Sequence, residues 1–153
     1  MLGLKSTMNV SGDAAAEMHN SNTHQIIDNS GALVAEVINV LKVKSGSGIG
    51  TVGDECVVVI KSAKPIPANL NISANSPAAA NKIRKGDIRR AVIVRTKQQI
   101  SRPDGRFLRF DDNAGVLINP KKELLGSRIS GVIAQEVRQK GWGKIASVAP
   151  KLL

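Results

Sequence analysis

Residues 82–109 read KIRKGDIRRAVIVRTKQQISRPDGRFLR, a basic segment with an apolar centre. Ten basic residues lie in it against two acidic ones, Asp87 and Asp104, and every arginine of the chain follows residue 83. Its run Val92-Ile93-Val94 is β-branched, which favours a strand over a disordered basic tail. The segment therefore predicts a folded β element whose exposed part meets a polyanion.

The same segment predicts a hairpin. A strand over 88–96 carries its apolar residues at the centre and its arginines at the ends. Pro103 and Gly105 then mark a turn at 102–105, because proline fixes φ and glycine accepts the left-handed region. Residues 107–110 are expected to return as the partner strand.

The rest of the chain favours a small mainly β domain. Strands are expected within 1–10 and at 32–43, 55–62 and 114–118, a turn at 28–31, and short helices at 121–125 and 133–140, each helix followed by glycine. Two polar or low-complexity stretches, 11–25 and 68–81, are expected to be exposed insertions. Together these elements predict one domain over 1–153, a small β-barrel with short C-terminal helices.

Charge is divided unevenly along the chain. Residues 1–80 hold five lysines against six acids, and residues 81–153 hold seventeen basic residues against six acids, so the net charges are −1 and +11. No apolar run approaches the roughly 20 residues that cross a bilayer. The single cysteine, Cys56, excludes an intramolecular disulfide and is expected to be a small buried hydrophobe. The first 25 residues match neither a secretory signal nor an arginine-rich transit peptide, which leaves import by another signal open.

The motif G-x-G-x-x-G at 48–53 is a candidate dinucleotide site. That motif works by opening a helix whose N-terminus holds pyrophosphate. Here Asp54 and Glu55 place negative charge at that point, and a strand follows. We therefore expect a glycine-rich loop between strands and no cofactor.

The sequence gives little support for a catalytic site or a metal site. His19 and His24 lie in the polar stretch without a ligand cluster, so no metal is expected. Asp111 and Asp112 are neighbours that would point to opposite faces of a strand, so turn capping by Asp111 or a salt link to Arg109 is expected. No enzymatic activity is predicted.

The aromatic content narrows the mode of polyanion binding. The chain has two phenylalanines, one tryptophan and no tyrosine, and Phe110 is expected to face the core. Single-strand binders stack bases on several exposed aromatics. Recognition of phosphates and RNA shape is therefore expected. The alternatives are a free-standing RNA chaperone or single-strand binder and, more remotely, a small oxidoreductase that uses the glycine motif.

Nine blocks in the chain form a recognisable series. They are DNSGA at 28–32, VGD at 52–54, KGD at 85–87, AVIVRTK at 91–97, RPDG at 102–105, RFDDNA at 109–114, VLIN at 116–119, GSRI at 126–129 and KIASVAP at 144–150. In order and spacing this series resembles large-subunit ribosomal protein L-fourteen. The resemblance implies a five-stranded β-barrel with a projecting β-hairpin ribbon and small C-terminal helices. It also implies a structural role in the large ribosomal subunit, at the face that meets the small subunit.

The resemblance implies partners and contact residues as well. The partners are large-subunit rRNA, ribosomal proteins L-three and L-nineteen, small-subunit rRNA across an intersubunit bridge, and the ribosome silencing factor. The matching basic positions would contact rRNA: Lys85, Arg95, Lys97, Arg102, Arg109, Arg128 and Lys144. The charge cluster itself adds four further candidates: Arg84, Arg89, Arg90 and Arg106.

Two departures from the family pattern bear on the compartment. The stretch 11–25 separates the first expected strand from DNSGA, and 68–81 lengthens the loop before KGD. The second insertion and the wording of the RFDDNA and VLIN blocks are similar to fungal mitochondrial members. A mitochondrial ribosome in the matrix is therefore expected, with the cytoplasm of a bacterium as the alternative.

Overall fold

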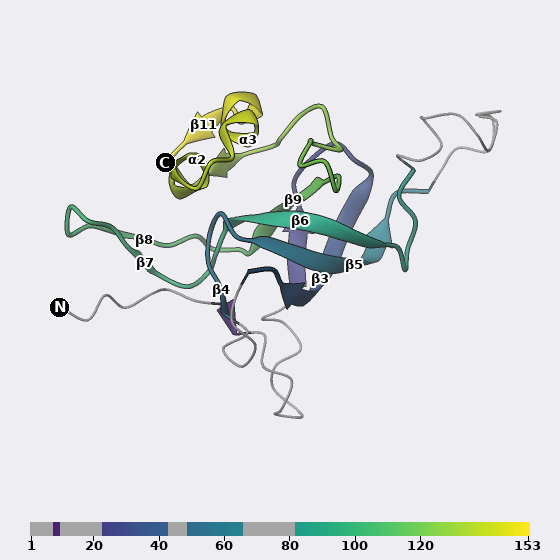
Figure 1. Cartoon of the computed structure of the whole chain (residues 1–153), viewed down its shortest axis with the longest axis horizontal. Helices are drawn as coiled ribbons and strands as arrows, with labels where there is room; N and C mark the ends of the chain where they lie inside the picture. Colours follow the sequence, from purple (N-terminus) through teal and green to yellow (C-terminus); the bar gives the residue numbers. More distant parts are fainter. Residues whose placement is uncertain (1–7, 10–22, 43–48, 66–81) are drawn as a thin grey trace.

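The computed structural model describes residues 8–9, 23–42, 49–65 and 82–153, and this part is mainly β (Figure 1). Its elements are β1 Met8–Asn9, β2 Thr23–Ile26, β3 Ala32–Val40, β4 Ile49–Gly50, β5 Glu55–Ala63, β6 Ile88–Arg95, β7 Ile100–Ser101, β8 Phe107–Leu108, β9 Ala114–Ile118, β10 Val132–Ile133, α2 Glu136–Gln139, α3 Gly143–Val148 and β11 Lys151–Leu152. A closed barrel, a ribbon that projects from it and a helical C-terminal segment confirm the predicted fold class. Within the described ranges, no helix is long and apolar enough to cross a membrane.

The barrel contains β2, β3, β5, β6 and β9 in that order. Neighbouring strands run antiparallel except β2 and β9, whose parallel pairing closes the ring. The β3–β5 register shifts three times, and such irregularities bend a strand enough to close a small barrel. Closure leaves no strand of the ring with an unpaired edge.

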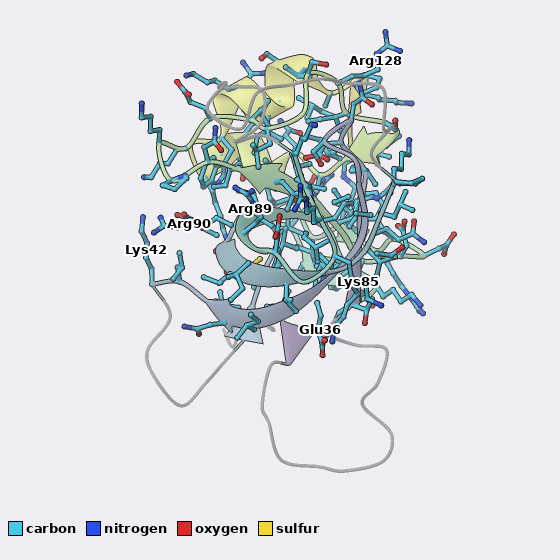
Figure 2. The ribbon with its side chains drawn as sticks, turned by 90° about the vertical axis from the view of Figure 1, so that its right-hand side faces the viewer. Glu36, Lys42, Lys85, Arg89, Arg90 and Arg128 are labelled. Carbon is cyan, nitrogen blue, oxygen red and sulfur yellow. The ribbon has the colours of Figure 1, made fainter. Side chains whose placement is uncertain are left out.

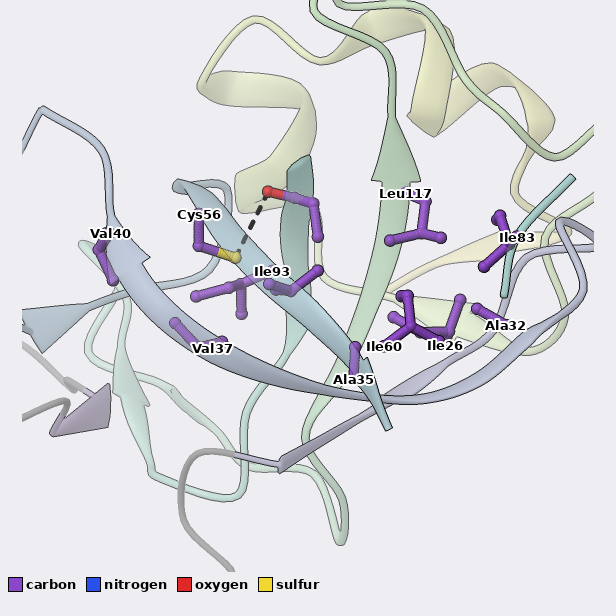
Figure 3. Close-up of a cluster of buried hydrophobic side chains, with 12 residues drawn as sticks. Ile26, Ala32, Ala35, Val37, Val40, Cys56, Ile60, Ile83, Ile93 and Leu117 are labelled. Atoms are coloured by element: carbon purple, nitrogen blue, oxygen red, sulfur yellow. Dashed lines mark hydrogen bonds between the residues drawn. The ribbon is translucent and has the colours of Figure 1, made fainter. Parts of the chain in front are cut away.

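Strand β6 is buried on both faces at its centre. Ala91 and Ile93 belong to the cluster inside the barrel, which Figure 3 shows, whereas Val92 and Val94 belong to a second cluster outside it. All four side chains are at most 2% exposed. Because both faces are covered, the centre of β6 is a continuous apolar run and its arginines lie only toward its ends.

The second cluster attaches the C-terminal segment to the barrel. It joins residues of β6 and β9 to Ile133, Val137 and Ile145 from β10, α2 and α3. These three side chains are at most 1% exposed. Short helices such as α2 and α3 are marginal alone, so their burial against the barrel accounts for their formation.

The turn predicted at 28–31 is confirmed and holds two parts of the chain together. The Asp28 carboxylate accepts hydrogen bonds from the backbone N–H of Leu117 at 2.8 Å and of Ser30 at 3.2 Å. Burial raises the pKa of Asp28, while these hydrogen bonds oppose the rise. A Cβ at Gly126 would lie 2.8 Å from the backbone nitrogen of Asn29, so only glycine permits this approach.

The predicted helix over 121–125 is wrong. The chain reverses there, because the Asn119 N–H donates to the Glu123 carbonyl at 2.8 Å. Lys122 takes a φ of 62°, which lies outside the right-handed helical region. The helix predicted over 133–140 is confirmed only for α2, since Val132–Ile133 pairs with β11 instead.

Besides the two-residue strands β4, β7, β10 and β11, the prediction lacked two longer elements, α3 and β2. Helix α3 begins at Gly143, two residues after Gly141, which is a poor local signal for a helix, and it contains the buried Ile145 and Ala146. The loop expected over 11–25 is wrong for its last three residues, which lie in β2, where His24 is 2% exposed and pairs with Ala35. Residues 11–22 and the whole stretch 68–81 lie outside the described residues.

The single thiol provides a probe of barrel opening. Cys56 in β5 is 1% exposed, as expected, and its Sγ donates to the Ala91 carbonyl at 3.5 Å (Figure 3). Burial raises its pKa from 9.0 to about 12, with the charges of Asp54 and Glu55 adding to the rise. The unfolded chain therefore ionises its thiol first, and the stability from this group is lost as pH rises from about 9 through about 12.

Alkylation of Cys56 should therefore require unfolding. Iodoacetamide attacks thiolates, so modification of the native protein at neutral pH should be slow and should accelerate through a urea titration in step with the unfolded fraction. Mass spectrometry gives the rate directly, because the chain has one cysteine. Native-state modification as fast as that of an unstructured peptide would contradict the buried position.

Candidate nucleic-acid interface

The two arginines at the start of β6 are accessible but lie near carboxylates. Arg90 Nη1 lies 3.2 Å from Glu55 Oε1, and Arg89 Nη2 lies 3.6 Å from Asp87 Oδ2. Their side chains are 43% and 28% exposed. Figure 2 shows both on one side of the molecule. Both can approach a phosphate while they compensate a neighbouring carboxylate.

The loop before β6 presents two further cations. The Asp87 carboxylate accepts the Arg84 N–H at 3.0 Å, and the Gly86 N–H donates to the Ile60 carbonyl at 2.8 Å. These bonds fix the loop against β5. Arg84 and Lys85 are both exposed on it (Figure 2 labels Lys85).

The predicted turn joins β7 to β8. The predicted partner is wrong, because β8 pairs with Ile100–Ser101 and not with the strand expected over 88–96. Gly105 takes a φ of 81°, and its N–H donates to the Arg102 carbonyl at 3.1 Å. Arg106 after the turn is 81% exposed, although its Nε lies 2.7 Å from Asp104 Oδ2. Arg109 beyond β8 is also exposed. Figure 1 shows the ribbon extending beyond the barrel. The exposure of both arginines leaves them accessible to a nucleic acid.

Arg102, predicted as an RNA contact, is instead engaged inside the protein. Its Nε donates to Glu136 Oε1 at 2.7 Å, and its Nη2 donates to Glu136 Oε2 at 3.3 Å and to the Leu153 carbonyl. The side chains of Arg102 and Glu136 are each 19% exposed. The hydrogen bond to Glu136 also raises the pKa of the Arg102 guanidinium. Arg102 therefore ties the ribbon to α2 and the end of the chain.

Arg95 is engaged in a similar way. Its Nη2 donates to Asp112 Oδ2 at 3.0 Å, and its side chain is 16% exposed. For the acidic residues 111–112, turn capping by Asp111 or a salt link to Arg109 was expected. Asp112 pairs with Arg95 instead, because Arg95 lies opposite Ala114 in the β6–β9 pairing, close to Asp112. The structure thus separates Arg95 and Arg102 from the accessible candidates.

The remaining candidates form one set, here called the open cations. Each is exposed, and none forms an ion pair with any residue that the structure describes. They lie on the loop before β6, after β6, after the ribbon, after β9 and on α3: Arg84, Lys85, Lys97, Arg109, Arg128 and Lys144.

Some exposed cations were missed by the sequence analysis. They lie outside the dense basic segment 82–109, so charge density did not single them out: Lys42, Lys121, Lys122, Arg138 and Lys151. Two of these lysines, Lys42 and Lys122, are distinguished by their backbone conformation, since both take positive φ values.

The glycine-rich motif connects strands, as predicted. Ile49–Gly50 is β4, the Asp54 N–H donates to the Thr51 carbonyl at 3.1 Å, and β5 follows. Over 49–65 the described chain contains no helix that could hold a pyrophosphate. The described ranges also bring together no three His, Cys, Asp or Glu side chains that could hold a metal.

Comparison with known proteins gives the family. A family model for Ribosomal protein L14p/L23e matches residues 17–153. Large ribosomal subunit protein uL14m of Schizosaccharomyces pombe is 50% identical over 129 residues, which cover 84% of this chain and 94% of that protein. The protein of the same name from Neurospora crassa is 48% identical over 124 residues, 81% of this chain and 90% of that protein.

A bacterial relative extends the comparison. Large ribosomal subunit protein uL14 of Petrotoga mobilis is 44% identical over 128 residues, which cover 84% of this chain and 93% of that protein. The matched segments cover the barrel, the ribbon and the C-terminal helices. The resemblance of the nine sequence blocks is confirmed, and the chain belongs to the ribosomal protein L14p/L23e family.

Proposed function

We propose that this ribosomal protein is a structural constituent of the large subunit of the mitochondrial ribosome and that it binds and neutralises rRNA there, in support of translation. The observation that carries the proposal is the set of open cations, whose side chains are exposed and form no ion pair in the described part of the chain. The uL14m names of two fungal relatives support the large subunit and the mitochondrion.

Neutralisation follows from the chemistry of these side chains. Each lysine or arginine that meets a phosphate releases a condensed counterion, and arginine can bind a phosphate bidentately. In Figure 2, Arg128 lies near the C-terminal helices and Lys85 lies at the opposite end of the barrel. Contacts spread in this way suit the shape of a folded RNA better than a single strand.

The finer partners belong to the same proposal. The resemblance of the sequence blocks supports ribosomal proteins L-three and L-nineteen as neighbours, small-subunit rRNA across an intersubunit bridge, and the ribosome silencing factor. It also supports a purely structural protein, without enzymatic activity. The whole chain acts as one domain, with insertions at 11–25 and 68–81, of which residues 23–25 lie in β2.

A free-standing single-strand binder has one observation in its favour. Phe107 on the ribbon is 63% exposed. The other two aromatic residues of the chain, Phe110 and Trp142, are half-buried and pack against the second cluster. One exposed ring provides no stacking platform for successive bases, so this alternative is the weaker one.

Salt dependence tests the assignment of the open cations. The wild-type protein should bind a large-subunit rRNA fragment with an affinity that falls steeply with salt concentration. The triple variant Arg84→Ala, Lys85→Ala, Arg109→Ala should reduce the slope of log K against log salt by roughly 0.9 for each duplex phosphate that is no longer neutralised, or about 2.7 for three phosphates. Filter binding over a salt series measures this slope.

A matched control uses Lys61→Ala. Lys61 is 55% exposed but lies 2.6 Å from Glu36, so it is expected to contribute little. An equal slope for the triple variant and the wild type would remove these residues from the interface. Sedimentation of tagged protein with cytosolic instead of mitochondrial large subunits would refute the compartment.

A further inference from the structure

A recess of about 330 Å³ lies between the barrel and the C-terminal segment. Its walls come from the turn after β3, the turn before β5, the reversal after β9 and the α2–α3 connection: Leu41, Lys42, Gly53, Asp54, Glu55, Lys122, Lys140, Gly141 and Trp142. The volume is at the lower end of the range for small-ligand sites. None of these residues is among the predicted RNA contacts.

Hydrogen bonds hold the walls in place. The Trp142 indole Nε1 donates to the Gly53 carbonyl at 2.8 Å. Lys140 Nζ donates to Thr51 Oγ1 and to Asp54 Oδ1, both at 2.7 Å. A Cβ at Gly53 would lie 2.6 Å from Lys140 Cδ, so the turn and the C-terminal segment touch closely. The recess is therefore formed before any ligand enters.

The charges in the recess favour an anion. Both carboxylates are compensated, Asp54 by Lys140 and Glu55 by Arg90. Lys42 and Lys122 are exposed and form no ion pair with any described residue. Two positive charges therefore remain in excess.

Both of these lysines adopt an uncommon backbone conformation. Lys42 takes a φ of 64° and Lys122 a φ of 62°, and they are the only non-glycine residues with positive φ in the described chain. Glycine adopts this conformation without steric cost, whereas a lysine is strained in it. Such strain collects at ligand sites, and here both strained residues line one recess.

We propose that the recess binds a nucleotide, with its phosphate on Lys42 and Lys122 and its base against the Trp142 indole. Trp142 is half-buried, packs against the second cluster and lines the recess. Stacking on an aromatic ring is the common way in which proteins hold an unpaired RNA base. If rRNA supplies the nucleotide, the inference rests on the proposed function. A free nucleotide carries the same phosphate and base and could occupy the recess in the same way.

Tryptophan emission tests the site. Trp142 is the only tryptophan and the chain has no tyrosine, so its fluorescence reports the recess alone. The full chain is titrated with an rRNA fragment, AMP, adenosine and inorganic phosphate, and filter binding measures total rRNA affinity in parallel. The rRNA fragment or AMP should change the emission saturably. Adenosine should bind about tenfold more weakly than AMP, and phosphate should displace AMP.

The variants Lys42→Gly and Lys122→Gly separate binding from backbone strain. Each should weaken the response about tenfold, while the melting temperature stays the same or rises because glycine suits the left-handed backbone. Lys121→Ala, on an exposed lysine next to Lys122 that does not line the recess, should leave the response unchanged.

The outcomes are distinguishable. A response to rRNA but not to AMP identifies RNA as the source of the nucleotide, and a response to AMP alone identifies a free nucleotide. Unchanged emission while rRNA binds overturns the recess and leaves the proposed function standing. Absence of any rRNA binding refutes the proposed function. Quenching by polyglutamate but not by rRNA or AMP would make the recess a peptide site and overturn the inference.

Discussion

Replacing Leu117 with alanine should lower the free energy of unfolding by about 3 kcal/mol. Leu117 lies in β9 with 0% exposure, inside the barrel cluster that Figure 3 shows. Strands on all sides form a closed ring, so the cavity left by the substitution cannot collapse easily. Urea denaturation should show the loss, and the melting temperature should fall by roughly 6–12 °C.

Leu33→Ala is the matched control for this variant. Leu33 is the same residue type in a barrel strand, but it is 42% exposed. Its replacement should change stability by less than about 0.5 kcal/mol. Equal losses for the two variants would contradict the assignment of inward and outward faces in the barrel.

Replacing Arg102 with alanine should cost about 1–2 kcal/mol, because it leaves a partly buried Glu136 carboxylate without its partner. The ribbon should also loosen, since Arg102 connects it to α2 and to the Leu153 carbonyl. Urea denaturation measures the first effect. Limited tryptic cleavage after Arg106 measures the second.

Arg106→Ala is the control from the same turn. Its guanidinium pairs with Asp104 in solvent, where ion pairs contribute little, so stability should not change. Glu136→Ala should destabilise the protein about as much as Arg102→Ala, and the double variant should cost less than the sum. Full additivity would show that the two side chains act independently.

Most of the barrel could be predicted from local sequence. Strands β5, β6 and β9 are dense in β-branched residues and begin where expected. Strand β2 gave no such signal, because Thr23-His24-Gln25 is polar and forms a strand only through its bonds to β3 and β9. Similarly, the pairing of β10 with β11 depends on residues that are far apart along the chain.

In the candidate site too, some features follow from the local sequence and others depend on how distant segments pack. Charge density identified the basic segment, and the exposure of Arg84 and Lys85 agrees with it. Sequence alone could not reveal that Arg102 meets Glu136, because that contact depends on where α2 packs. Isolated lysines such as Lys42 gain meaning only from the recess that tertiary packing creates.

The parallel pairing of β2 with β9 also constrains when the protein can fold during synthesis. Gln25 pairs with Ala114, so the barrel cannot close until the ribosome has made and released β9. Residues 119–153, which complete the second cluster, are made after every strand of the ring. The nascent chain therefore exposes the apolar residues of β3, β5 and β6 until β9 is available, and the chain is most prone to aggregate in this interval.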